Sequence, residues 1–363
     1  MKTTRLEQYI DWRGDLLISE DGLQLADSII LSELAYLDLK PVFCDKSVRE
    51  VKLSECAEII AAKDAYCLKT VTGGMETFVY KACACPRYRD IIVRRYLDIY
   101  EEEKDMQFAA VEFVLDEKTS FTAFRGTDNT LTGWKEDFMM SFTETAGQVY
   151  AAAYLNRMLE EEREYYVGGH SKGGNLALYA CASLPEEKRK KIRKIYLNDA
   201  PGLAAEIMAP ERYQGLADRI IRLVPSFGFI GRLFPLSCGE LHIVRCTDES
   251  LLSHDLSHWK IMGRGVEETD RFHSFSNYLC KAINEWIEKI SQDEREQFVE
   301  ELFGALSAGG ADTIQEIAGK GFLQVLKKAV SSSDVSKKTI QELILTAVQS
   351  GIRKDTEIET NAV

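Results

Sequence analysis

Residues 164–177 read EYYVGGHSKGGNLA, and this stretch decides the fold. It begins as an apolar run that favours a β-strand, turns through small residues, and continues as a helix-forming run. The turn contains Gly169-His170-Ser171-Lys172-Gly173, which has the G-x-S-x-G spacing of a nucleophile elbow. Glycines there leave room for backbone to pack closely around a strained turn. We therefore expect Ser171 to be a catalytic nucleophile beside a helix N-terminus, whose free N–H groups stabilise an oxyanion.

The regions around this elbow alternate between helix and strand patterns. A helix is expected at about 147–162, and the helix that follows the elbow is expected to run to about 183. Apolar strand patterns follow at 194–198, 219–224 and 241–245, and a hairpin pattern precedes the elbow at 108–115 and 120–124. This order predicts an α/β-hydrolase fold, an α/β class with a mostly parallel sheet and helices on both faces.

The ends of the chain are expected to be helical. We predict an N-terminal helical lead-in at 1–105, with a helix at 26–36 and further helices from 45 onward, packed on a core at 106–270. C-terminal helices are expected at 271–351, before a polar tail at 352–363. Ser291 and Glu294 have the spacing of a capping box, and Ser331-Ser332-Ser333-Asp334 precedes a last helix. We expect the C-terminal helices to pack on the core as part of one domain.

Composition limits the classes of partner. The 363 residues are 45% hydrophobic and 28% charged, and the formal net charge of −13 argues against nucleic acid or an anionic membrane surface as the main partner. No apolar run is long enough for a membrane helix, and the N-terminus lacks the apolar core of a signal peptide. Nine scattered cysteines, in no zinc or redox spacing, predict reduced thiols, no bound metal or cofactor, and a cytoplasmic protein.

A serine nucleophile needs a general base, and the sequence offers five histidines. His170 lies in the elbow itself and is not expected to reach back to its neighbour, while His242 lies in a strand pattern typical of a satisfied core histidine. His273 lies beside a stripe of apolar residues at helical spacing and is typical of a helix-surface histidine, although its late position keeps it a candidate. His254 and His258 lie on a loop after the last strand, where the order Ser…acid…His places the base. We expect His254 to be the base, with His258 as the alternative.

The orienting acid has three candidates: Asp199, Asp248, and Asp255, which adjoins His254. Asp199 closes the strand that follows the elbow helix, and its alternative reading is a turn aspartate before Ala-Pro-Gly. Asp248 follows the last strand. We expect Asp199 to be the acid.

The oxyanion hole needs one N–H group from Lys172, directly after the nucleophile, and a second from an earlier loop. Phe124-Arg125-Gly126-Thr127-Asp128 follows a strand, so we expect the second N–H group from Thr127. Arg125 and Asp137 are expected to form an ion pair that holds this loop.

Taken together, these motifs resemble the lipase class 3 α/β-hydrolases, and nearly the whole chain resembles the Mbeg-like family of bacterial proteins. The resemblance rests on Phe124-Arg125-Gly126-Thr127, Trp134, Asp137, the elbow, Asp199-Ala200-Pro201-Gly202 and His254-Asp255. It implies the fold and a Ser-His-Asp triad. In two places the chain departs from the secreted lipases: Lys172 replaces a leucine, and Val224-Pro225-Ser226-Phe227 lacks their aspartate, which leaves Asp199 or Asp248 as the acid.

Two functions follow from these observations. The first is a serine hydrolase that cleaves a carboxylic ester or thioester of a small molecule or lipid through an acyl-enzyme. The second is an inactive hydrolase-fold protein that binds a lipid or protein partner. Labelling of the serine by a fluorophosphonate separates them, because only an activated serine reacts quickly.

Overall fold

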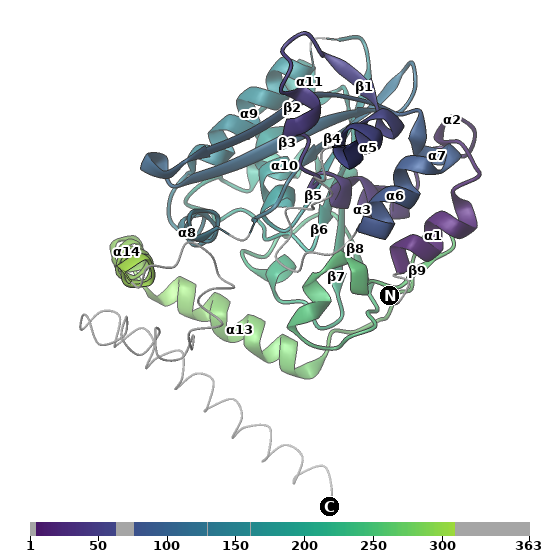
Figure 1. Ribbon diagram of the computed structural model, residues 1–363. Helices are drawn as coiled ribbons and strands as arrows, with labels where there is room; N and C mark the ends of the chain where they lie inside the picture. Colours follow the sequence, from purple (N-terminus) through teal and green to yellow (C-terminus); the bar gives the residue numbers. More distant parts are fainter. Residues whose placement is uncertain (1–4, 63–75, 129, 160, 309–363) are drawn as a thin grey trace, which may run out of the picture.

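The computed structural model describes residues 5–62, 76–128, 130–159 and 161–308. Eight strands form one sheet in the order of the sequence, from β1 to β8 (Figure 1). The strands are β1 (Glu50–Lys52), β2 (Ile92–Glu101), β3 (Met106–Val114), β4 (Thr119–Phe124), β5 (Glu164–His170), β6 (Ile192–Asn198), β7 (Ile220–Pro225) and β8 (Glu240–Val244). A separate antiparallel pair is formed by β9 (Ile261–Met262) and β10 (Gly265–Val266).

The sheet has an antiparallel part and a parallel part. Strands β1 to β4 pair antiparallel, and β4 to β8 pair parallel. The predicted hairpin is therefore present as β3 and β4. The connections between the parallel strands carry α8 (Leu131–Met139), α9 (Ala146–Met158), α10 (Lys172–Ser183), α11 (Glu186–Arg189) and α12 (Glu211–Gln214).

Helices cover both faces of the sheet. Successive side chains of a strand point to opposite faces, so apolar residues at successive positions need cover on both. On β3, Phe108 and Ala110 face the core that α9 and α10 close, while Val111 and Phe113 face the core that the N-terminal helices close. Burial on both faces explains why these strands are apolar at successive positions. The N-terminal helices are α1 (Arg5–Arg13), α2 (Ile18–Asp21), α3 (Leu25–Leu34), α4 (Lys40–Phe43), α5 (Leu53–Ala62), α6 (Glu76–Ala84) and α7 (Pro86–Arg89).

Helix α3 is held at the sheet by buried polar contacts. Asp27 is fully buried and accepts hydrogen bonds from Arg87 Nε at 2.7 Å and from the Tyr88 hydroxyl at 2.5 Å. At the end of β6, Asn198 Nδ2 donates to Ser32 Oγ at 3.0 Å. These donors satisfy the hydrogen-bonding capacity of the buried carboxylate. These contacts fix the end of α3 beside the carboxyl ends of the parallel strands.

The prediction of a helical lead-in before residue 105 is wrong for residues 50–52 and 92–101, which are strands. Residues 92–101 form β2, which pairs with β3 along most of its length, and β1 pairs with β2. The register shifts between Arg94 and Leu97, and Arg95 has a φ of 55°, so an irregularity hides the alternation expected of a strand. Arg94 pairs with Glu112 of β3, with Nε 2.9 Å from the carboxylate. Contacts between strands, and not the local pattern, make this segment a strand.

Two C-terminal helices, α13 (Ser274–Lys289) and α14 (Gln292–Ala308), lie against the rest of the fold. The capping box is present, since Ser291 and Glu294 exchange hydrogen bonds. The ring of Phe303 lies 5.6 Å from that of Phe138 in α8, and Arg295 pairs with Glu206 at 2.9 Å. The predicted helix after Ser331-Ser332-Ser333-Asp334 and the polar tail at 352–363 lie outside the described residues.

The division of the chain at residues 105 and 270 stays a prediction. Within the ranges described above, no helix combines the length and the apolar character that crossing a membrane requires.

Candidate active site

The turn around Ser171 has the geometry of a nucleophile elbow. Ser171 joins β5 to α10 with a φ of 56°, in a region that non-glycine residues enter at an energetic cost. A Cβ atom on Gly173 would lie 2.1 Å from the carbonyl oxygen of Phe124, so only glycine fits between the elbow helix and β4. The close contact fixes Ser171 relative to the end of β4.

The structure brings Ser171, His254 and Asp199 into one chain of hydrogen bonds. Ser171 Oγ lies 3.0 Å from His254 Nε2, and His254 Nδ1 lies 2.6 Å from Asp199 Oδ2. A carboxylate only accepts hydrogen bonds, so Nδ1 of neutral His254 carries the proton and Nε2 accepts from the serine hydroxyl. This is the arrangement in which an imidazole can remove a proton from serine.

Asp199 is fully buried at the end of β6. Its φ is 44°, and its backbone N–H donates to the carbonyl of Leu223 on β7 at 2.7 Å. The second carboxylate oxygen, Oδ1, accepts the backbone N–H of Gly231 at 2.8 Å. Both oxygens therefore have donors. Of the two alternative acids, Asp248 makes no hydrogen bond to His254 in the described part of the chain, and Asp255 Oδ1 accepts the backbone N–H of Ser257 at 2.8 Å.

His170 supports the backbone of His254, which the sequence did not predict. Its Nε2 lies 2.8 Å from the His254 carbonyl oxygen, and its Nδ1 lies 3.0 Å from the Tyr36 hydroxyl. Because a carbonyl only accepts, Nε2 carries the proton and Nδ1 accepts from the phenol. Burial, and then the nearby His254, lower the pKa of His170 well below its ordinary value. His170 is therefore a neutral positioning residue.

The other three histidines bond elsewhere. His242 Nδ1 lies 2.9 Å from Glu268, so it has a partner as predicted, although it is only partly buried. His258 Nδ1 lies 3.3 Å from Ser257 Oγ, and the ring of His273 lies 5.0 Å from that of Phe227. His254 is thus the histidine that lies against the elbow serine in the described chain.

Lys172 has a buried ion-pair partner behind the elbow. Its Nζ lies 2.9 Å from Glu136 Oε2, and both side chains have no exposed surface. The ammonium also donates to the carbonyl oxygen of Gln107 at 2.8 Å. Glu136 Oε1 accepts the backbone N–H of Gly147 at 2.9 Å. The lysine that replaces the leucine of the secreted lipases therefore ties α10 to α8, α9 and β3.

The predicted ion pair between Arg125 and Asp137 is wrong. Arg125 Nη2 lies 3.1 Å from Asp98 of β2 and 3.6 Å from Asp128, whereas Asp137 accepts a hydrogen bond from Thr127 Oγ1. The prediction failed because it treated residues 92–101 as helix, which left Asp98 out of reach of the loop. Burial raises the pKa of Asp137 to about 7, against the lowering effect of the Lys172 charge.

The loop with the predicted oxyanion donor passes directly against the elbow. A Cβ atom on Gly126 would lie 3.3 Å from Ser171 Cβ and 2.2 Å from the Tyr36 hydroxyl oxygen. Tyr36 also accepts a hydrogen bond from the backbone of Gly126. Thr127 and Lys172, whose N–H groups were predicted to form the oxyanion hole, both line the cavity at Ser171. Their role in binding an oxyanion stays a prediction.

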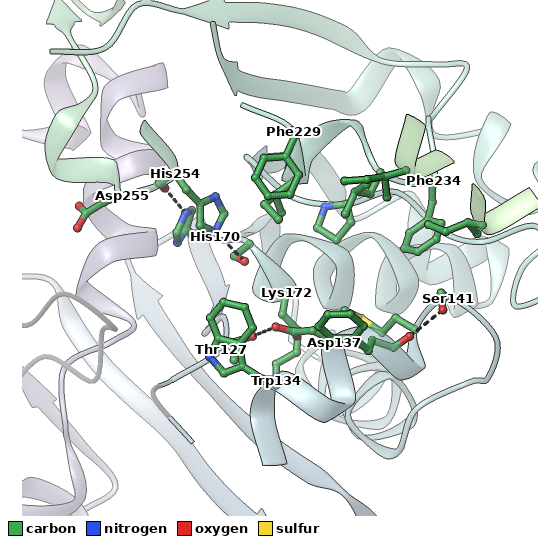
Figure 2. A pocket seen from close by; sticks show the side chains of 18 of the residues that line it. Thr127, Trp134, Asp137, Ser141, His170, Lys172, Phe229, Phe234, His254 and Asp255 are labelled. Carbon is green, nitrogen blue, oxygen red and sulfur yellow. Dashed lines mark hydrogen bonds between the residues drawn. The ribbon is translucent and has the colours of Figure 1, made fainter. Parts of the chain in front are cut away.

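A cavity of about 470 Å³ opens at Ser171. Figure 2 shows His254 and Asp255 at one side and Phe234 and Ser141 at the other, with Phe229 between them. Beyond Phe234, helices α13 and α14 complete the wall with apolar side chains: Ile283, Ile287, Phe298 and Val299. A cavity of this size and lining suits an apolar ligand with a few fixed polar contacts.

Within the described ranges, no group of three or more histidine, cysteine, aspartate or glutamate side chains is arranged to hold a metal ion.

A strained serine between the central parallel strand β5 and α10, in a sheet covered by helices on both faces, defines an α/β-hydrolase fold. The model of the Mbeg1-like family matches residues 82–304, which is more than half of the chain. The chain therefore belongs to this family.

Comparison with curated proteins gives no significant match. Among solved structures, the chain is similar to the Rhizomucor miehei lipase in a propeptide complex, at 15% identity and a TM-score of 0.40 over 62% of this chain and 68% of that chain. It is also similar to lipase II from Rhizopus niveus, at 16% identity and a TM-score of 0.38 over 68% of this chain and 86% of that chain. The chain is similar as well to M37 lipase, at 17% identity and a TM-score of 0.31 over 49% of this chain and 69% of that chain.

Proposed function

We propose that the protein is a serine hydrolase that cleaves a carboxylic ester or thioester through an acyl-enzyme. The observation that carries the proposal is the chain of hydrogen bonds from Ser171 through His254 to Asp199. An isolated serine hydroxyl is a weak nucleophile, and an adjacent oriented base activates it. The buried carboxylate of Asp199 keeps the base in the tautomer that can accept the serine proton.

The reaction takes place in two halves. Ser171 Oγ attacks the carbonyl carbon while its proton moves to His254 Nε2, and the oxyanion is bound by the N–H groups of Thr127 and Lys172. The C–O or C–S bond then breaks, and the leaving group takes the proton from His254. Water attacks the acyl-enzyme in the second half, with His254 again as base, and releases the acid and free Ser171.

The cavity favours an acyl group as the part of the substrate that is bound beyond Phe234. Its wall there is apolar and is completed by side chains such as Ile287 and Phe298 of the C-terminal helices. Burying an alkyl chain against such a wall stabilises the complex by about 0.8 kcal/mol for each CH₂ group. The substrate class in this proposal is thus a small-molecule or lipid ester. We also propose a cytoplasmic location. The cysteines are odd in number and scattered, which is typical of reduced thiols and not of a disulfide framework.

Labelling with a fluorophosphonate tests the proposal. Wild-type protein is expected to be labelled and to hydrolyse p-nitrophenyl butanoate, and Ser171→Ala is expected to lose both properties. Ser141→Ala is the matched control, because Ser141 also lines the cavity but its hydroxyl donates to the carbonyl oxygen of Phe138 at 2.8 Å. If wild-type protein is neither labelled nor active, the proposal is wrong, and the second function, that of an inactive hydrolase-fold binding protein, is favoured.

A further inference from the structure

A carboxyl group that the proposed mechanism does not use lies in the wall of the cavity. Glu33 is near the C-terminal end of α3, is 4% exposed, and lines the cavity together with Tyr36. In the part of the chain that the structure describes, its carboxyl group has no hydrogen-bond donor. A buried carboxyl without a partner costs free energy unless a ligand supplies one.

The surroundings of Glu33 are electronegative. Asp255 also lines the cavity and interacts with the Glu33 carboxyl through its charge. The C-terminal end of α3, where Leu34 is the last residue, adds the negative end of a helix dipole. Both effects oppose ionisation of Glu33, and both favour a cation placed between them.

The positive charges that line the same cavity have other partners. Lys172 pairs with Glu136 at 2.9 Å, and Arg295 pairs with Glu206 at 2.9 Å. The two nearest imidazoles, His170 and His254, are joined by the contact described above, and burial lowers the pKa of His170 well below its ordinary value.

Tyr36 is the remaining titratable group on this side of the cavity. Its phenol donates to His170, and burial holds its pKa well above the ordinary value, so it stays neutral. The charge of Arg125 also acts on Tyr36, and Arg125 pairs with Asp98 at 3.1 Å. In the described chain, no cationic side chain therefore forms an ion pair with the Glu33 carboxyl group.

Burial, followed by the charge of Asp255, raises the pKa of Glu33 to about 8. Glu33 therefore holds its proton at neutral pH while the cavity is empty.

The position of Glu33 relative to the nucleophile assigns it to one part of the substrate. Figure 2 shows Phe234, on the proposed acyl side of the cavity, to one side of His254 and Asp255 to the other. Glu33 lines the cavity three residues before Tyr36, and Tyr36 is joined through His170 to the backbone of His254, the residue before Asp255, so Glu33 lies on this second side. A serine hydrolase binds the leaving group there, next to the base that protonates it.

We propose that Glu33 and Asp255 bind a positively charged amine on the leaving group of the ester. This inference rests on the proposed function. When an ammonium group enters, Glu33 ionises, releases its proton to solvent, and forms an ion pair in a site of low dielectric. The ammonium keeps its charge throughout: the acyl C–O bond breaks, the alcohol oxygen takes the proton from His254, and an amino alcohol leaves.

A matched pair of esters tests the proposal. 2-(Dimethylamino)ethyl butanoate and 3-methylbutyl butanoate share an acyl group and have leaving groups of nearly equal shape, but only the first carries a cation at pH 7. We expect wild-type protein to hydrolyse the cationic ester with a kcat/KM at least about tenfold higher, after correction for their intrinsic rates. Equal values, with the neutral ester hydrolysed, would overturn this proposal and leave the proposed function standing.

Two variants and a control locate the effect. Glu33→Gln is expected to reduce the preference for the cationic ester to about twofold or less. Asp255→Asn is expected to reduce it in part. Glu20→Gln removes an acid on an exposed part of α2 and is expected to keep the full preference. A preference that survives in both Glu33→Gln and Asp255→Asn contradicts the proposal.

A binding experiment separates this proposal from the failure of hydrolysis. The amides N-[2-(dimethylamino)ethyl]butanamide and N-(3-methylbutyl)butanamide mimic the two esters and resist cleavage. We expect the first to bind wild-type protein about tenfold more tightly and to release close to one proton, measured by calorimetry in buffers of different ionisation enthalpy. Equal affinity without proton release overturns the proposal, whether or not the protein hydrolyses esters.

Discussion

The imidazole of His170 donates a hydrogen bond from Nε2 to the backbone carbonyl of His254, at 2.8 Å and across 84 residues of sequence. The two rings lie 4.5 Å apart. On its other side, His170 accepts a hydrogen bond from Tyr36. The residue before the proposed nucleophile therefore holds the backbone of the proposed base, and an N-terminal tyrosine holds that residue in turn.

Removal of the Tyr36 hydroxyl tests this support. In Tyr36→Phe, His170 loses its donor and the backbone of Gly126 loses an acceptor, so His254 and the oxyanion loop are held less firmly. We expect kcat for p-nitrophenyl butanoate to fall about tenfold while KM changes little. Tyr80→Phe, at an exposed tyrosine, is the control. An unchanged kcat in Tyr36→Phe contradicts a positioning role.

The hydrogen bonds of Asp199 predict the effect of an asparagine at this position. In Asp199→Asn, the side-chain oxygen stays with the N–H of Gly231, so the NH₂ group faces His254 Nδ1. His254 must then accept at Nδ1, which puts its proton on Nε2 toward Ser171. We expect a fall in kcat of about 10³-fold or more, as for His254→Ala. Asp248→Asn should stay within a factor of two of wild type, and near-UV circular dichroism checks that each variant is folded.

The buried pair of Lys172 and Glu136 predicts a large effect on stability. Lys172→Leu leaves the carboxylate of Glu136 buried without its cation, and we expect the free energy of unfolding to fall by about 3–5 kcal/mol. In the double variant Lys172→Leu/Glu136→Gln the loss should be smaller, because no uncompensated charge remains. Urea unfolding measures both. A double variant less stable than Lys172→Leu would rule out charge burial as the cause.

Glu33 predicts a pH dependence of stability. Its pKa is raised from 4.5 to about 8, so below pH 4.5 the carboxyl is protonated in the folded and unfolded chains alike. Between these values only the folded chain holds the proton, and stability is lost as the pH rises through this window. Glu33→Gln should remove this part of the decrease, and Glu20→Gln should keep it. Thermal unfolding from pH 4.5 to pH 9 gives the difference, and parallel curves for Glu33→Gln and wild type contradict the prediction.

The C-terminal wall of the cavity predicts a change in preference for acyl length. Ile287→Trp fills space on the acyl side beyond Phe234. We expect kcat/KM for p-nitrophenyl octanoate to fall about tenfold or more, while that for the acetate stays close to wild type. Lys289→Trp, on the same helix but outside the cavity lining, is the matched control. An equal loss for both esters would indicate damage to the fold instead.

The sequence was informative where structure is decided locally. The elbow, the strands around it and the capping box of Ser291 depend on residues close in sequence, and the structure has each of them. The order of elements also sufficed to bring Ser171, His254 and Asp199 together, because the carboxyl ends of parallel strands meet at one edge of the sheet. Their chemical roles stay predictions.

The rest depended on contacts between distant segments. The irregular strand β2 has charged residues whose partners, such as Glu112, lie on the neighbouring strand, so its local pattern did not indicate a strand. That error also hid Asp98, the partner of Arg125. Likewise, the contact of His170 with His254 required the positions of both loops, although a histidine directly before the elbow serine is a polar residue at a buried position and was a signal.

The contact of Ser171 with His254 has a consequence for the growing polypeptide. A nascent chain leaves the ribosome with Tyr36 first, then Ser171, and His254 only 83 residues later. Until His254 emerges, the elbow has no base, and until α13 and α14 follow, the cavity has no far wall. The activity proposed for Ser171 is therefore delayed until most of the described chain has been synthesised. A product truncated before residue 254 has Ser171 without its proposed base, and we expect it to be inactive.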